Sequence, residues 1–132
     1  MASTLIEQAL YNYLLAQEAV TTVFGSRLYF VEADQDTAKP YCVFFVVSDP
    51  HAAAYFDKIH AGQARIQFSI FDSDKYVPRN GAKTIRDELQ YYRGAMDEFN
   101  VERIVCSGII NGPRVRKDIY HFMFDAFVEY WE

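Results

Sequence analysis

The feature that most restricts the fold of this sequence is the alternation of residue character, with a period of two, in two long segments. In Gln63–Asp72 the apolar positions are Ala64, Ile66, Phe68 and Ile70. In Ile119–Trp131 one face takes Tyr120, Phe122, Phe124, Ala126, Val128 and Tyr130, and the other takes His121, Asp125 and Glu129. A period of two residues indicates a β-strand with one face buried and the other in water. Both segments are therefore predicted to be strands that bury one face.

Three other segments have helical spacing. The first opens with the capping-box pair Thr4 and Glu7, which precedes apolar residues at helical intervals. The second is Glu18–Phe24, which Gly25 is predicted to end because glycine accepts the left-handed cap conformation. The third has its firm part at Ala82–Tyr92. Ser73 or Asp74 is its predicted cap, Pro78 and Gly81 delay or kink its start, and Gly94 is its predicted stop.

The remaining strands complete a two-layer domain. Arg27–Val31 is a short predicted strand, and Pro40–Pro50 is so rich in Val and Phe that we expect it to be buried on both faces. Val101–Ile110 is another, broken by a turn at residues 111–113. The order α-α-β-β-β-α-β-β and the length of 132 residues predict one domain over 1–132. Its expected class is α+β, with an antiparallel or mixed β-sheet and helices packed on one face.

The composition restricts the classes of partner. Ten Tyr, eleven Phe and one Trp are many for one core of this size, and such residues are also enriched at protein–protein interfaces. The net charge of −5 argues against gripping nucleic acid, which needs clustered cations, but it suits a surface past which DNA slides. We expect no membrane span, because no stretch approaches 18 consecutive apolar residues.

No set of residues predicts catalysis or a bound cofactor. Cys42 and Cys106 lie in apolar runs that predict buried thiols, although a disulfide between them stays open. His51 and His60 flank an irregular segment near Asp49 and Asp57, where solvated side chains are favoured over a metal site. Asp72-Ser73-Asp74 is interpreted as helix capping rather than a metal pair. His121 is expected to be exposed or paired at the surface. The prediction is no catalytic residue, no metal and no cofactor.

Two segments are candidates for contacts with partners. His51–Gly62 has no clean period and is predicted to be a long loop or a hairpin, with Tyr55, Phe56 and Ile59 as a candidate subunit interface. Arg114, Arg116 and Lys117 follow the Gly112-Pro113 turn and, with Arg103, form a candidate basic patch for an acidic partner or passing phosphates. The alternative for this cluster is a solvated hairpin tip.

The order and spacing of several short motifs extend over nearly the whole chain. They are Gly25, Arg27 and Leu28-Tyr29 after the opening helices, then Pro40-Tyr41 and Ser48-Asp49-Pro50 around a hydrophobic strand, and a closing aromatic strand at Phe127–Trp131. In this order the chain resembles the siphophage tail-completion family, the tail-terminator or tail-to-head joining proteins. It departs from that family in its richness in Phe and Tyr and in the segment His51–Gly62.

The resemblance implies a structural role in a virion. Relatives form a ring, typically a hexamer, that caps the finished tail tube, stops its growth and docks on the head connector. DNA then passes through the bore without specific binding. The implied partners are copies of the chain, the tube protein and the connector protein. The implied location is the head–tail junction, after synthesis in the host cytoplasm, and the family has no catalytic residues.

Two other classes of function stay open from the sequence. One is a dimeric α+β domain that binds a small molecule or is an enzyme, which would need a deep pocket with converging polar groups. The other is a different part of the same junction, either a connector adaptor or a tail tube subunit.

Overall fold

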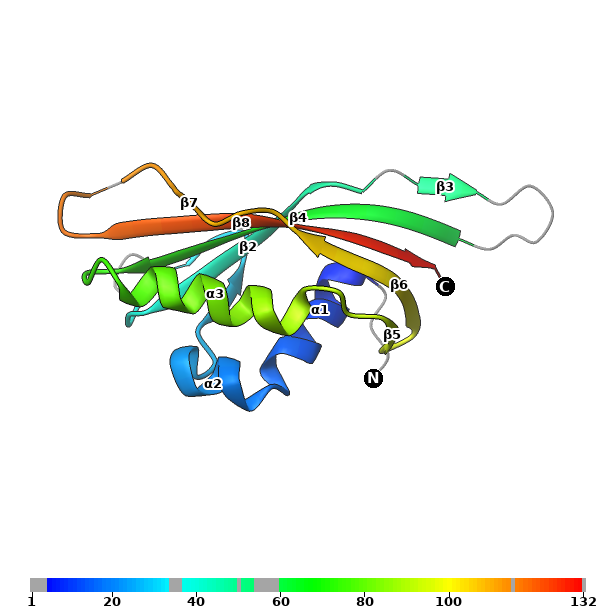
Figure 1. Cartoon of the computed structure of the whole chain (residues 1–132), viewed down its shortest axis with the longest axis horizontal. Coiled ribbons are helices and arrows are strands. Elements are labelled where there is room, and N and C mark those ends of the chain that lie inside the picture. Colours follow the sequence, from blue (N-terminus) through cyan, green and yellow to red (C-terminus); the bar gives the residue numbers. More distant parts are fainter. Residues whose placement is uncertain (1–4, 34–36, 50, 54–59, 115, 132) are drawn as a thin grey trace.

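The computed structural model describes residues 5–33, 37–49, 51–53, 60–114 and 116–131. Thr4 of the predicted capping box lies outside these residues, and so do Tyr55, Phe56 and Ile59 of the candidate interface. The described part folds into a mixed sheet with helices on one side, which confirms the α+β prediction (Figure 1).

The three described helices are α1 (Ile6–Leu15), α2 (Glu18–Phe24) and α3 (Val77–Leu89). Gly25 ends α2 with φ at 60°, as predicted. Helix α3 begins earlier than its predicted firm part, because Pro78 lies in the first turn, where a missing N–H costs little. It also ends before Gly94, which instead opens a strand.

The acidic residues before α3 bind backbone amides, as the capping interpretation predicted, although the N-cap residue is Tyr76 rather than Ser73 or Asp74. The Asp74 Oδ1 atom accepts hydrogen bonds from the backbone amides of Tyr76 at 2.7 Å and Val77 at 3.4 Å. The Asp72 Oδ2 atom accepts one from the Asp74 amide at 2.8 Å. Both carboxylates therefore order the turn into the helix.

The sheet path runs β1-β2-β4-β8-β6-β5. The bounds are β1 Leu28–Phe30, β2 Tyr41–Ser48, β3 His51–Ala53, β4 His60–Asp72, β5 Gly94–Met96, β6 Phe99–Cys106, β7 Ile110–Asn111 and β8 Tyr120–Trp131. Of the described pairs, β1 with β2 is parallel and the others are antiparallel.

A long central pair, β4 with β8, sets the length of the molecule. The two strands stay in register from Ala61 opposite Trp131 to Asp72 opposite Tyr120. Strand β3 pairs with β4 near one end of this ribbon, and the connection from β7 to β8 lies at the other end (Figure 1). The ends of His51–Gly62 are thus strands rather than loop, which agrees with the hairpin alternative.

The core lies between the sheet and the helices. Three fully buried aromatic rings stack across neighbouring strands: the centroid of Phe68 is 5.7 Å from that of Phe44 and 5.2 Å from that of Phe124. The helices supply Leu10, Leu14, Phe24, Ile85 and Leu89 to the same cluster. Gly81 permits close packing, because a Cβ there would lie 2.6 Å from Phe24 Cζ.

Strand β2 is not buried on both faces, so the prediction for Pro40–Pro50 is wrong in that respect. Cys42 and Phe44 are buried beneath the helices, whereas Val43 and Phe45 are only half-buried. Val47, at an irregularity in the register with β4, is 43% exposed. The physical reason is that the helices cover one face of the sheet and leave the other uncovered within this subunit (Figure 1).

Candidate assembly surface

The sheet face opposite the helices carries the candidate functional surface. Arg65 of β4 lies opposite Phe127 of β8, which lies opposite Val105 of β6, so these side chains share one face. The same alternation gives the members of this surface, which we call the open face: Val43, Phe45, Arg65, Phe71, Val105, Ile110, Met123, Asp125 and Phe127.

Several apolar members of the open face are exposed to solvent. Ile110 is 58% exposed, Val105 is 37% exposed and Phe127 is 36% exposed. Val105 lies opposite Phe127 in the register, and Ile110 lies opposite Met123 on the other side of Asp125. Exposed apolar side chains gathered on one face of a sheet are a mark of protein–protein contact.

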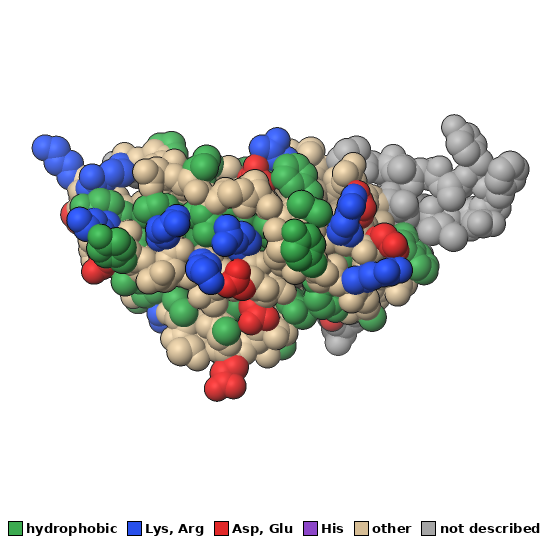
Figure 2. All heavy atoms as spheres, viewed as in Figure 1, with side chains coloured by type: hydrophobic (Ala, Val, Ile, Leu, Met, Phe, Trp, Pro, Cys, Tyr) green, Lys and Arg blue, Asp and Glu red, His purple; other side chains and the backbone are tan. Residues whose placement is uncertain are grey.

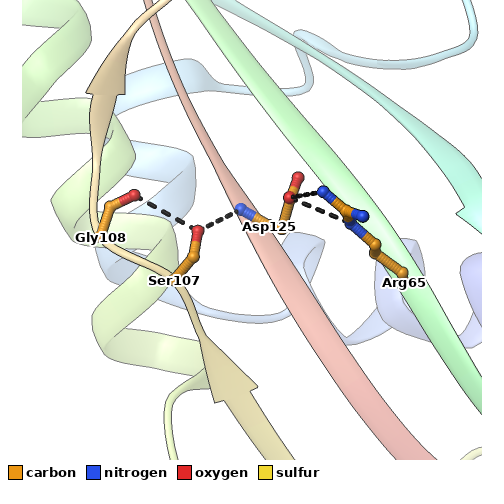
Figure 3. Close-up of polar contacts among 4 residues, drawn as sticks. All are labelled: Arg65, Ser107, Gly108 and Asp125. Carbon is orange, nitrogen blue, oxygen red and sulfur yellow. Dashed lines mark hydrogen bonds and ion pairs between the residues drawn. The ribbon is translucent and has the colours of Figure 1, made fainter.

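A charged pair on the open face joins Arg65 of β4 to Asp125 of β8 (Figure 3). The Arg65 guanidinium donates to Asp125 Oδ2 from Nε at 3.1 Å and from an Nη atom at 2.7 Å. The backbone amide of Asp125 donates to Ser107 Oγ at 2.8 Å, and the Ser107 amide donates to the Asp125 carbonyl at 2.8 Å. These bonds hold Asp125 against the end of β6.

Asp125 retains an acceptor atom that no described residue uses. Its Oδ1 atom is buried and has no hydrogen-bond donor among the described residues. Arg65 in turn lies over the Phe127 ring, 5.6 Å from the centroid. Aromatic residues and arginine together are typical of the centres of interfaces, where a partner supplies missing donors.

The sequence carries a signal for the open face that the sequence analysis does not use. Phe127 and Met123 alternate with Asp125 and Glu129 on the side of β8 that was classed as polar. Large apolar residues on the wet face of a strand were the signal. Val105 and Ile110 gave no comparable signal, because their face became clear only from the register with β8.

The predicted basic patch is brought together only in part. Arg114 lies over the Tyr120 ring at 4.3 Å, Arg116 pairs with Asp118 at 3.3 Å, and Lys117 is exposed. Arg103 does not join them, because it pairs with Glu129 at 3.0 Å near the other end of β8. The patch is thus confined to the β7–β8 connection.

His121 is half-buried on β8 and is hydrogen-bonded at the surface, which agrees with the surface-paired alternative and not with full exposure. Its ring stacks on Phe71 with centroids 4.3 Å apart, and its Nδ1 donates to the Pro113 carbonyl at 2.9 Å. Its Nε2 is buried and has no partner among the described residues. Gly112 lies against the ring, since a Cβ there would be 2.3 Å from Nδ1. Burial lowers the pKa of His121, and the hydrogen bond to Pro113 opposes this.

Acidification is therefore expected to destabilise the protein through His121. The unfolded chain titrates near the ordinary pKa of 6.5 and the folded protein below it, so between these values the unfolded state binds more protons. The stabilisation is fully present above about pH 6.5 and is lost as the pH falls toward the folded pKa. Urea unfolding at about pH 7.5 and pH 5.5 should show a larger loss in wild type than in His121→Gln. Equal losses in the two proteins would contradict this.

The thiols are poorly suited to nucleophilic chemistry. Cys42 and Cys106 are free and buried, as the sequence predicted. Burial raises the pKa of both thiols, that of Cys106 to about 12, so they stay protonated at neutral pH. In the described part of the chain, no three His, Cys, Asp or Glu residues are grouped as metal ligands. None of the described helices is long and apolar enough to cross a membrane.

Two mainly apolar hollows lie on the surface. One, of about 410 Å³, lies between α1 and β1 and includes Leu5, Tyr11, Phe30 and Phe44. The other, of about 390 Å³, lies beside the β7–β8 connection. Its lining includes Tyr41, Val43, Phe45, Phe71 and Arg116, and we call it the hairpin groove.

Comparison with known proteins gives a likeness of fold. The fold belongs to the α+β class, with helices on one face of a mixed sheet. A chain in a solved virion has a similar fold. That structure is the virion of a native gene transfer agent particle, matched with a TM-score of 0.71 and 15% sequence identity over 94% of each chain. No family model matches this sequence, and no curated protein matches it.

Proposed function

We propose that this protein is a structural subunit of a phage-like virion. In this proposal it forms a ring, typically of six copies, that caps the tail tube, ends its growth and joins the tail to the head connector. The observation that carries the proposal is the likeness of fold, over 94% of both chains, to a chain of a gene transfer agent virion. The order of sequence motifs from Gly25 to Trp131 favours the tail-terminator role among the parts of such a particle.

The open face supports a role in assembly. An isolated subunit leaves Val105, Ile110 and Phe127 exposed around the Arg65–Asp125 pair. Burying these side chains against a partner removes apolar surface from water, and a partner donor can satisfy Asp125 Oδ1. We propose that the part of the open face around Val105, Ile110 and Phe127 contacts the tube or connector protein, each stable contact burying on the order of 1,000 Å² or more.

The net charge suits the passage of DNA. At −5 per subunit, a ring repels phosphates on average, so DNA passes through the bore without specific binding. The proposed location is accordingly the head–tail junction of the particle.

The function is tested by deleting the gene in cells that produce the particle and imaging the products by electron microscopy. The expected products are heads without tails and tails of uncontrolled length, and both defects should be reversed by supplying the protein from a plasmid. Normal particles from the deletion strain would contradict the proposal.

Tyr55 and Phe56 are proposed to contribute to assembly together with Ile59. We expect Tyr55→Ala plus Phe56→Ala to leave the fold intact and to weaken the oligomer about tenfold or more, since each truncation removes aromatic contact area. Light scattering at dilute concentration measures the oligomer. Tyr91→Ala, which removes an aromatic side chain that is 75% exposed, is the control. An unchanged oligomer in the double variant would refute this assignment.

A further inference from the structure

We propose that in the ring a basic end of one subunit docks on an acidic end of the next. The inference rests on the proposed ring and names the two surfaces that form its repeating contact. The basic end comprises residues 73–79, 112–114 and 116–119, beside the hairpin groove. The acidic end comprises Asp49, the β5–β6 turn at Asp97 and Glu98, and Trp131.

The basic end gathers residues from two segments. The register of Asp72 with Tyr120 places the turn after β4 beside the chain that enters β8. These segments contain the cations Lys75, Arg79, Arg114, Arg116 and Lys117 against the two carboxylates Asp74 and Asp118. Figure 2 shows Lys and Arg side chains gathered at the same end of the molecule, where Figure 1 places the β7–β8 connection.

The acidic end is held together by contacts around Tyr130. The Tyr130 hydroxyl donates to Asp49 Oδ1 at 2.9 Å, and its ring packs edge-on against Phe99 at 5.4 Å. Phe99 directly follows the turn that carries Asp97 and Glu98, both of which are exposed. The nearby cations Arg93 and Arg103 are paired with Glu102 and Glu129, so their charges are offset locally.

The two ends cannot meet within one subunit. They lie at opposite ends of β8, whose twelve residues span roughly 36 Å at about 3.3 Å per residue, from Tyr120 to Trp131. A contact between unlike ends of identical subunits is heterologous, and it closes a ring when the rotation between neighbours closes. Opposite charges at the two ends also steer subunits into this head-to-tail arrangement.

Apolar side chains accompany the charges at both ends. The hairpin groove places Tyr41, Phe45 and Phe71 next to Arg116. Trp131 at the acidic end is 41% exposed. A large aromatic side chain beside carboxylates is the complement of an apolar groove bordered by cations, so the fit combines both kinds of contact.

Charge reversal at each end tests the contact. Arg116→Glu plus Lys117→Glu makes both ends acidic, and Asp49→Lys plus Glu98→Lys makes both ends basic. Asp97 is left unchanged because it accepts a hydrogen bond from Asn12 at 3.0 Å. Each variant alone is expected to associate on the order of 100-fold more weakly than wild type, because like charges then face one another. Light scattering and negative-stain microscopy measure the assemblies, and circular dichroism checks the fold.

Mixing provides the decisive result. An equimolar mixture of the two variants should restore rings of alternating subunits, and a chain with all four substitutions should assemble alone. Ala19→Glu plus Thr22→Glu places two new carboxylates on exposed positions of α2, away from both ends, and should assemble like wild type.

Two outcomes separate the contact from the function. If wild type forms rings and the reversed variants form them equally well, or if mixing fails to restore rings, the end-to-end contact is overturned and the ring stands. If wild type forms no ring at any concentration or salt, the proposed function fails and this contact with it.

Discussion

Replacing Val105 and Ile110 with aspartate is expected to abolish attachment of the protein to the particle while leaving the subunit folded. Both side chains are exposed on the open face, so the charges cost little in the isolated subunit. In an assembled particle the same carboxylates would be buried without partners, which costs at least ~2 kcal/mol per contact. Co-purification of the tagged variant with particles from complemented deletion cells measures attachment.

The control for this prediction places the same charges on the helical layer. Ala19→Asp plus Thr22→Asp changes two exposed positions of α2 without altering the open face. This variant should attach like wild type. Normal attachment of the Val105 and Ile110 variant would show that the open face does not contact a partner in the particle.

Truncating Phe68 to alanine is expected to destabilise the subunit by about 3–5 kcal/mol. The ring is fully buried and stacks between Phe44 and Phe124 at the centre of the sheet. Its removal loses contacts on both sides and leaves a cavity that flanking strands cannot close. Urea unfolding followed by circular dichroism gives the change in free energy.

Phe127→Ala is the matched comparison for Phe68→Ala. Phe127 lies on the open face of the neighbouring strand and is 36% exposed, so its loss should cost only about 1 kcal/mol. If the two variants lost similar amounts of unfolding free energy, the core could not lie only on the side of the sheet that faces the helices.

Much of the fold could be predicted from the sequence because its signals are local. Alternation in Gln63–Asp72 matches β4, with Ala64, Ile66, Phe68 and Ile70 all buried. Gly25 ends α2 because its φ of 60° favours glycine. The mixed character of the sheet needed the structure, since the parallel pairing of β1 with β2 depends on contacts between separate segments.

The misplaced prediction for Pro40–Pro50 has a physical cause. Pro40–Pro50 reads as a strand buried on both faces because Val and Phe occupy both sides of it, yet only one face meets the helices. A sequence pattern does not distinguish apolar residues that are buried in the subunit from apolar residues that become buried only when subunits assemble. His121 lies on the predicted face of β8, where Phe71 and Gly112 lie against its ring and half-bury it.

The candidate site was predictable only in part. Arg114, Arg116 and Lys117 stand out as a run, and they do lie together at the β7–β8 connection. Arg103 was grouped with them because a sequence does not show that Glu129 lies opposite it on β8. The Arg65–Asp125 pair joins residues 60 positions apart, so only the register of β4 with β8 could reveal it.

The most direct measurement is negative-stain electron microscopy of the purified protein over a range of concentrations and salt. If the subunit works by burying its flanks against copies of itself, images should show closed rings with a central opening, fewer of them as salt screens the unlike ends. A uniform population of compact dimers without an opening, at every condition, would contradict that account.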